Sequence, residues 1–139
     1  MGTLLKKEQA QRNPRTGLEL GICSATIPGV DPPFTLAHNI MPPGYRSSTH
    51  YHTNVCRGTY VAKGRIRFFF GPEDNQQVID AEAGDYIYTS RGEIHSQLNL
   101  SDTETAEYTS TYVGTSDRNQ LGTVLVGTRK TGGGNQRSG

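Results

Sequence analysis

The sequence predicts an all-β fold in a single domain, and three observations lead to this prediction. The chain has 139 residues, the length of one ordinary domain. Between its ends, short apolar, β-branched and aromatic runs recur at roughly 8–12-residue spacing, bounded by Gly, Pro, Asn and Asp, as in a β-sandwich or β-barrel. No convincing amphipathic helix follows residue 20, so we expect little helix.

The expected strands follow one another closely along the middle of the chain. Residues 34–41 alternate in polarity and end at a Pro-Pro-Gly turn. Residues 65–70 (RIRFFF) place Ile66, Phe68 and Phe70 on one face, which should therefore be buried. The other expected strands, each bounded by turn signals, are 58–64, 76–85 with its closing turn, 86–90, 94–100, 106–114 and 122–127.

The two ends of the chain differ from its middle. Residues 1–17 are polar and are expected to form a flexible arm, residues 129–139 a disordered glycine-rich tail, and residues 18–128 the β-barrel. The start lacks the apolar stretch of a secretory signal, and no apolar run reaches the ~18 residues of a membrane span. We therefore expect a cytoplasmic protein without a membrane partner.

Charge and cysteine content narrow the function classes further. The formal net charge is +1, so no overall field favours nucleic acid as a partner. Cys23 and Cys56 lie far apart without a pairing signature, and two free thiols are expected. The triple glycine 132–134 belongs to the tail and is no phosphate-binding loop, so no organic cofactor is predicted.

Glycines and histidines form two regularly spaced sets. The first is Gly44, five residues, His50, one residue, His52, eleven residues, Gly64. The second is Gly84, five residues, Ser90, one residue, Gly92, two residues, His95, three residues, Asn99.

These two sets resemble the two signature motifs of the cupin superfamily, with germin-like spacing in the first. The second set matches except at Ser90, where the family usually has proline, and the family's glutamate of the first motif would fall at Arg57. The resemblance covers residues 44–99 and implies a double-stranded β-helix, a jelly-roll-type barrel of two antiparallel sheets. Because such proteins often dimerise, it also implies a homodimer.

Physical reasoning on the histidines leads to a metal site. His50 and His52, at i and i+2 on a strand, point to the same face, and His95 from another strand can meet them inside a barrel. Three imidazoles suit a divalent transition metal, and without a carboxylate they favour iron, zinc or nickel over manganese. Gly92 is expected to bend the chain before His95, and Asn99 to hold the end of its strand or loop.

Position 57 leaves three alternatives open, because neighbouring residues on a regular strand face opposite sides. The spacing of the resembled motif puts Arg57 inside, where it could bind a carboxylate or phosphate of a ligand but could not ligate a metal. A one-residue bulge would put Cys56 inside instead, as a fourth, thiolate ligand. Arg57 could also turn outward and leave the three histidines alone.

Two more residues are candidates for a catalytic role beside Arg57. Gln97 shares a face with His95 and could hydrogen-bond a metal-bound water or the substrate. Among the seven tyrosines, Tyr88 is the one that we expect to reach the site. His38 is expected to be structural or at the surface, and Glu93 to be a solvated turn residue.

We therefore expect a metal-binding cupin, an enzyme acting on a small oxygenated or anionic organic molecule. The resemblance implies dioxygenase-, lyase- or isomerase-type chemistry and does not choose among them. Two other hypotheses stay open: a non-catalytic barrel that binds a metal or small ligand, and a metal-free cupin enzyme that uses a histidine as its base.

Overall fold

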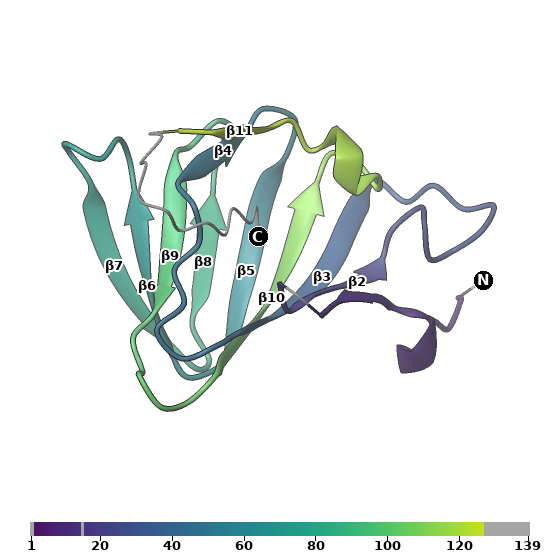
Figure 1. Cartoon of the computed structure of the whole chain (residues 1–139). Coiled ribbons are helices and arrows are strands. Elements are labelled where there is room, and N and C mark those ends of the chain that lie inside the picture. Colours follow the sequence, from purple (N-terminus) through teal and green to yellow (C-terminus); the bar gives the residue numbers. More distant parts are fainter. Residues whose placement is uncertain (1, 15, 127–139) are drawn as a thin grey trace.

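The structure is a computed structural model that describes residues 2–14 and 16–126. Two antiparallel sheets face each other and enclose the interior, which confirms the predicted all-β jelly-roll (Figure 1). The described residues contain no α-helix, only two short 3-10 turns, η1 (Lys7–Gln9) and η2 (Arg118–Gln120). None of their helices is long and apolar enough to cross a membrane.

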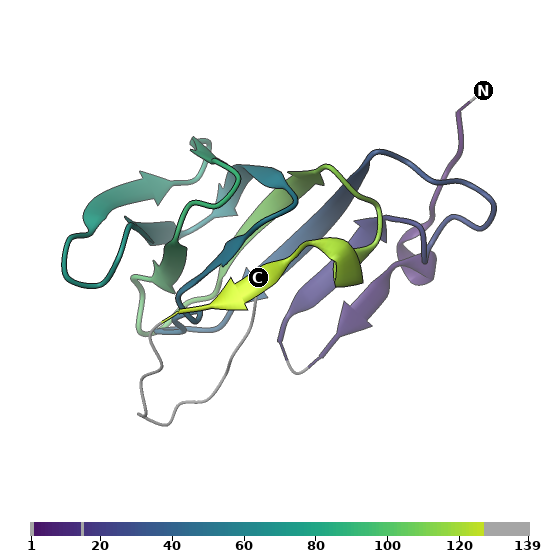
Figure 2. The same ribbon diagram turned by 90° about the horizontal axis from the view of Figure 1, so that it is seen from above.

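One sheet has six strands and the other has five. The six-stranded sheet consists, in spatial order, of β1 (Gln11–Asn13), β2 (Leu18–Ile22), β3 (Phe34–Met41), β10 (Ala106–Val113), β5 (Cys56–Lys63) and β8 (Tyr86–Thr89). The five-stranded sheet consists of β11 (Thr123–Leu125), β4 (His50–His52), β9 (His95–Asn99), β6 (Arg65–Phe70) and β7 (Gln77–Glu82). In Figure 2, seen from above, β11 and β3 lie in different layers.

Strands far apart in the sequence are neighbours in space. β10 pairs with β3 along its whole length, from Val113 opposite Phe34 to Ala106 opposite Met41. On its other side β10 pairs with β5. The last strand, β11, pairs with β4, so the C-terminal end of the described chain supports the strand that carries His50 and His52.

The inward faces of the strands build two apolar clusters with polar residues between them. The larger cluster contains Met41, Val61, Ile66, Phe68, Phe70, Ala81, Ala106 and Tyr108, and the smaller contains Leu18, Ala37, Val55, Tyr112 and Leu121. Between these clusters, buried Thr59 and Ser110 are hydrogen-bonded at 2.9 Å across β5 and β10. The interior therefore offers polar surroundings beside the smaller cluster, which includes Tyr112.

All eight predicted strands are present, whereas β1 and β2 near the start of the chain were not predicted. The predicted bounds of β3 and β6 coincide with those observed, and the other predicted strands shift by one to three residues. The segment predicted as a flexible arm contains η1 and β1, and β1 pairs with β2. The predicted glycine-rich tail lies outside the described residues.

Candidate metal centre

Three histidines from two neighbouring strands meet inside the barrel. His50 and His52 are the ends of β4 and face inward, while Tyr51 between them faces outward. His95 begins β9 and lies directly opposite His50. One ring nitrogen of each histidine lies within 4.8 Å of those of the other two. All three side chains are buried, as the i, i+2 spacing and the second motif predicted.

Hydrogen bonds to the Nδ1 atoms orient these rings. His50 Nδ1 lies 2.8 Å from the carbonyl oxygen of Ser48, and His95 Nδ1 lies 2.9 Å from that of Glu93. Since a carbonyl oxygen can only accept, Nδ1 carries the proton in both rings, and Nε2 keeps a bare lone pair. His52 Nδ1 lies 2.9 Å from Thr123 Oγ1, a hydroxyl that can accept in the same way.

The three Nε2 atoms are buried and have no hydrogen-bond partner among the described residues. Buried polar atoms are nearly always paired, and leaving one unpaired costs about 1–3 kcal/mol. Three such atoms that converge within coordination reach form a donor set for a metal ion, since neutral imidazole is a common ligand for zinc, iron, copper and nickel. The residues present therefore fit a divalent transition metal.

Burial and nearby cations keep the imidazoles neutral. Burial lowers the pKa of His50 to about 4 and that of His52 to about 3, and repulsion from Arg57 and Arg118 adds to both shifts. The pKa of His95 also lies well below its ordinary value, because of burial and then Arg57. Neutral rings are the state that a metal ion needs.

The turn between β8 and β9 sets the position of His95. Gly92 has a φ of +79°, in the left-handed region that glycine adopts without strain, and its N–H donates to the carbonyl of His52 at 2.8 Å. In the same turn, Ser90 N–H donates to Glu93 Oε1 at 3.0 Å. This turn therefore ties the strand carrying His95 to the strand carrying His52. The positive φ of Gly92 agrees with the predicted bend before His95.

Arg57 points into the barrel and is only 1% exposed. β5 runs in regular register through Cys56 and Arg57, and the irregularity in its pairing with β10 falls near Glu107 and Tyr108 instead. Alternation then puts Arg57 inside with Thr59 and Val61. Its Cζ lies 5.9 Å from the ring centre of Tyr112.

The ring of Tyr112 also packs against the three-histidine group, with its centre 5.7 Å from the centre of the His52 ring. The guanidinium of Arg57 therefore packs against the same aromatic ring as one of the three histidines.

Gln97 connects Arg57 to the larger apolar cluster. Arg57 Nη2 donates to Gln97 Oε1 at 3.3 Å, and Gln97 Nε2 donates to the hydroxyl of Tyr108 at 2.7 Å. Burial raises the pKa of Tyr108 well above its ordinary value, so its hydroxyl keeps its proton. The structure thus places two predicted site residues, Arg57 and Gln97, in direct contact.

Two other candidates lie away from the histidines. Cys56 lies on the opposite face of β5 from Arg57, opposite the exposed Val113, and is not part of the three-histidine group. Tyr88 is 67% exposed, because Thr89 takes the inward position opposite Arg57. The absence of a bulge at Cys56 and the alternation of β8 explain these placements, which do not support the predicted thiolate ligand or the predicted role of Tyr88.

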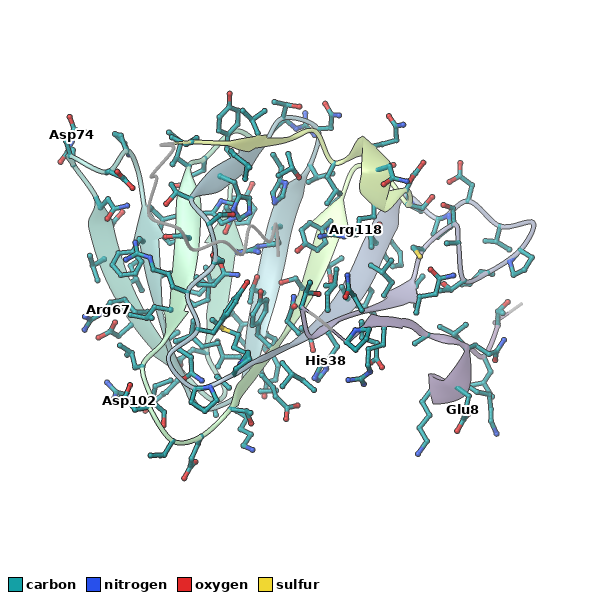
Figure 3. All side chains as sticks on the ribbon, in the orientation of Figure 1. Glu8, His38, Arg67, Asp74, Asp102 and Arg118 are labelled. Carbon is teal, nitrogen blue, oxygen red and sulfur yellow. The ribbon has the colours of Figure 1, made fainter. Side chains whose placement is uncertain are left out.

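The remaining sequence-based expectations concern residues around the site. Asn99 Nδ2 donates to the carbonyls of Met41, Pro42 and Glu104 at 2.9–3.2 Å and so holds the end of β9. His38 is not part of the three-histidine group, and its Nε2 lies 3.0 Å from Glu107 Oε1. In Figure 3, His38 is labelled below Arg118.

Sequence reasoning missed several residues that shape the site. Thr123 lies 71 residues from its partner His52, and no local pattern marks it. Tyr108 and Tyr112 could have been found, because they share the inward face of β10 at i and i+4. Arg118 lies in η2, in a segment without a predicted element.

Comparison with known proteins agrees with this fold. The family model for the cupin domain matches residues 37–112, more than half of the chain. The chain therefore belongs to the cupin family. A search among curated proteins gives no significant match.

Solved structures share the fold at low identity. Oxalate oxidase is similar with a TM-score of 0.68 and 22% identity, over 88% of this chain and 63% of that chain. Oxalate decarboxylase from Bacillus subtilis, an enzyme with Mn(II) centres, is similar with a TM-score of 0.70 and 20% identity, over 91% of this chain and 33% of that chain. Peruvianin-I, a cysteine peptidase from Thevetia peruviana latex, is similar with a TM-score of 0.70 and 16% identity, over 91% of this chain and 78% of that chain.

The chain thus spans less than two thirds of the oxalate oxidase and about a third of the decarboxylase. At these identities the likeness concerns the fold alone.

Proposed function

We propose that this cupin is a metal-dependent enzyme that acts on a small oxygenated or anionic organic molecule. The observation that carries the proposal is the convergence of three buried Nε2 atoms without hydrogen-bond partners, on His50, His52 and His95. These three residues would hold the metal through Nε2, since their Nδ1 atoms are already engaged. When bound, such a metal polarises a substrate oxygen or offers open coordination positions.

The protein's own groups define what else the site can do. Arg57 supplies a permanent positive charge, and Gln97 holds it in place through the hydrogen bond at 3.3 Å. The buried histidines are neutral over the physiological pH range, so they act as ligands and not as proton donors. Burial of all these groups weakens competition from water and strengthens their electrostatic effect on a ligand.

The donor set bears on which metal is bound. Because the group that the described residues form consists of three imidazoles without a carboxylate, we expect iron, zinc or nickel in preference to manganese. The Mn(II) centres of the Bacillus subtilis oxalate decarboxylase show that another protein of this fold uses manganese. Dioxygenase-, lyase- and isomerase-type chemistry are each compatible with a three-histidine centre.

Metal content is the decisive measurement. Elemental mass spectrometry on the untagged protein should give about one divalent metal per chain, and a His50→Ala, His52→Ala double variant should lose it. A matched control is His38→Ala, which removes a histidine outside the centre and should leave the metal in place. If the wild-type protein binds no metal after reconstitution, the metalloenzyme is excluded, and direct binding of an organic ligand by Arg57 and the histidines becomes the working hypothesis.

A further inference from the structure

We propose that Arg57 is a carboxylate-binding residue, and that a carboxylate of the small-molecule ligand completes the metal centre in place of a protein acid. This inference rests on the proposed metal site and adds the chemical class of its ligand. It also makes a quantitative claim: the carboxylate and the metal bind cooperatively, through Arg57.

The first argument is the position of Arg57 in the barrel. The side chain comes from β5 in the six-stranded sheet, and the histidines come from β4 and β9 in the other sheet. Arg57 and His52 nevertheless contact the same ring, that of Tyr112. The positive charge of Arg57 also helps to lower the pKa of all three histidines, because it disfavours their protonated forms. The guanidinium therefore shares the interior of the barrel with the metal ligands.

The second argument is that Arg57 is held in a fixed orientation. Gln97 Oε1 accepts from Nη2, and Gln97 is itself held by the Tyr108 hydroxyl at 2.7 Å. All three side chains are almost completely buried. A guanidinium is a planar fork of five N–H donors that matches the two oxygens of a carboxylate, and fixing it in advance reduces the entropy lost when a ligand binds.

The third argument is an unsatisfied hydroxyl beside Arg57. Thr89 lies directly opposite Arg57 on β8, is 2% exposed, and its Oγ1 has no hydrogen-bond partner among the described residues. Residues directly opposite on antiparallel strands share a face, so this hydroxyl faces the same interior. A ligand oxygen at Arg57 would give Thr89 the partner that buried hydroxyls normally have.

The fourth argument is the charge of the complete centre. Three neutral imidazoles with a divalent ion carry two positive charges, and Arg57 adds a third. A carboxylate attracted by both cations lowers the energy of an arrangement in which they otherwise repel each other. A carboxylate also has the planar shape and the two oxygens of the glutamate that the cupin motif usually has at position 57. Phosphate is larger and tetrahedral, and we therefore infer a carboxylate.

The test is the linkage between metal and carboxylate binding, measured without any activity assay. Zinc affinity is determined by competition with a chromogenic chelator, in buffer alone and with saturating acetate, acetamide or inorganic phosphate. For the wild-type protein, acetate should tighten zinc binding by about tenfold or more, the usual size of a coupling between sites. Acetamide, neutral and of the same shape, should have no effect.

Two arginine variants then separate this inference from the metal site itself. Arg57→Gln should still bind zinc but lose the acetate effect, whereas Arg67→Gln should keep it, because Arg67 is an exposed arginine that pairs with Asp80. A protein that binds no zinc at all refutes the metal site. A wild-type protein that binds zinc equally with and without acetate, or that responds to phosphate instead, overturns the present inference alone.

A third variant covers the case in which Arg57→Gln does not fold. Gln97→Glu keeps the volume of the side chain and places a carboxylate next to Arg57. This internal acid should compete with the ligand, so zinc should bind more tightly without acetate and the response to acetate should fall to less than about twofold. A full acetate response in Gln97→Glu would show that the anion binds elsewhere and would overturn the assignment to Arg57.

Discussion

Each histidine of the centre is oriented by a different acceptor, and these acceptors are not equally replaceable. Backbone carbonyls of Ser48 and Glu93 orient His50 and His95, and no side-chain substitution removes them. His52 alone depends on a side chain, the hydroxyl of Thr123. Partners of this kind fix the tautomer of a ligating histidine, and losing one usually costs 10–100-fold in metal affinity.

Thr123→Val should therefore weaken metal binding by about 10–100-fold without changing the fold. Valine keeps the branched shape of the strand residue but leaves the Nδ1–H of His52 without its acceptor. Zinc affinity, measured by chelator competition, checks this result. Thr123→Ser is the matched control, since it keeps the hydroxyl and should bind zinc within a few-fold of wild type. Equal affinities for valine and serine would contradict the orienting role.

Position 57 gives a second prediction for a single residue. Arg57→Glu replaces a positive charge with a negative one at the position where the cupin motif usually has glutamate. Because the repulsion is removed and an oxygen ligand is gained, metal affinity should rise by at least about tenfold, with the largest relative gain for manganese. Metal binding by calorimetry for manganese and zinc measures this change. Arg57→Met serves as control: it removes the charge without adding a ligand and should give a smaller gain for both metals.

At the scale of strands, the sequence predicts those elements whose polarity alternates. β3 and β6 follow from FTLAHNIM and RIRFFF because every second side chain is buried. β1 is exposed throughout, and β2 is half-buried without alternation. These two strands owe their place to pairing with each other and with β3, which is a tertiary effect that a local pattern does not carry.

The same reasoning explains which parts of the site could be predicted. The three histidines were found because spacing along a strand determines the face on which a side chain lies. The direction of Arg57 depended on whether β5 contains a bulge, and the register with β10 decides that. Thr123 was missed because β11 reaches β4 only through the fold. Long-range pairing thus accounts for what the sequence left open.

Asn99 gives a prediction for the connection between β9 and β10. Its amide donates to three backbone carbonyls, and its Oδ1 accepts from Ser101 N–H at 3.0 Å. Asn99→Ala should lower the free energy of unfolding by about 3 kcal/mol, because several buried backbone groups lose their partner. Urea unfolding measures the loss. Asn75→Ala, in the exposed turn between β6 and β7, should change stability by less than about 0.5 kcal/mol. An equal effect of both variants would refute the prediction.

The whole molecule combines a small apolar core with a buried polar centre, and this combination should make its stability depend on pH. Arg57, Gln97 and the three histidines are buried in the barrel between the two sheets. The folded protein keeps His50 and His52 neutral down to a pKa of about 4 and about 3, whereas an unfolded histidine titrates near 6.5. Below pH 6.5 the unfolded chain therefore binds more protons than the folded one.

The free energy of unfolding of the metal-free protein should therefore fall as the pH decreases from about 6.5 toward about 4. The sign follows from linkage: where the unfolded state binds more protons, acid favours unfolding. From pH 8 to pH 5 the loss should be about 2 kcal/mol for each buried histidine. Urea unfolding of chelator-treated protein at several pH values measures this loss.

The His50→Ala, His52→Ala variant should show a smaller loss, whereas His38→Ala should follow the wild-type curve, since His38 lies outside the centre. Parallel curves for wild type and the double variant would mean that these histidines are not buried in their neutral form. Adding zinc should increase the loss toward acid pH, because protons then compete with the metal for the same three nitrogens.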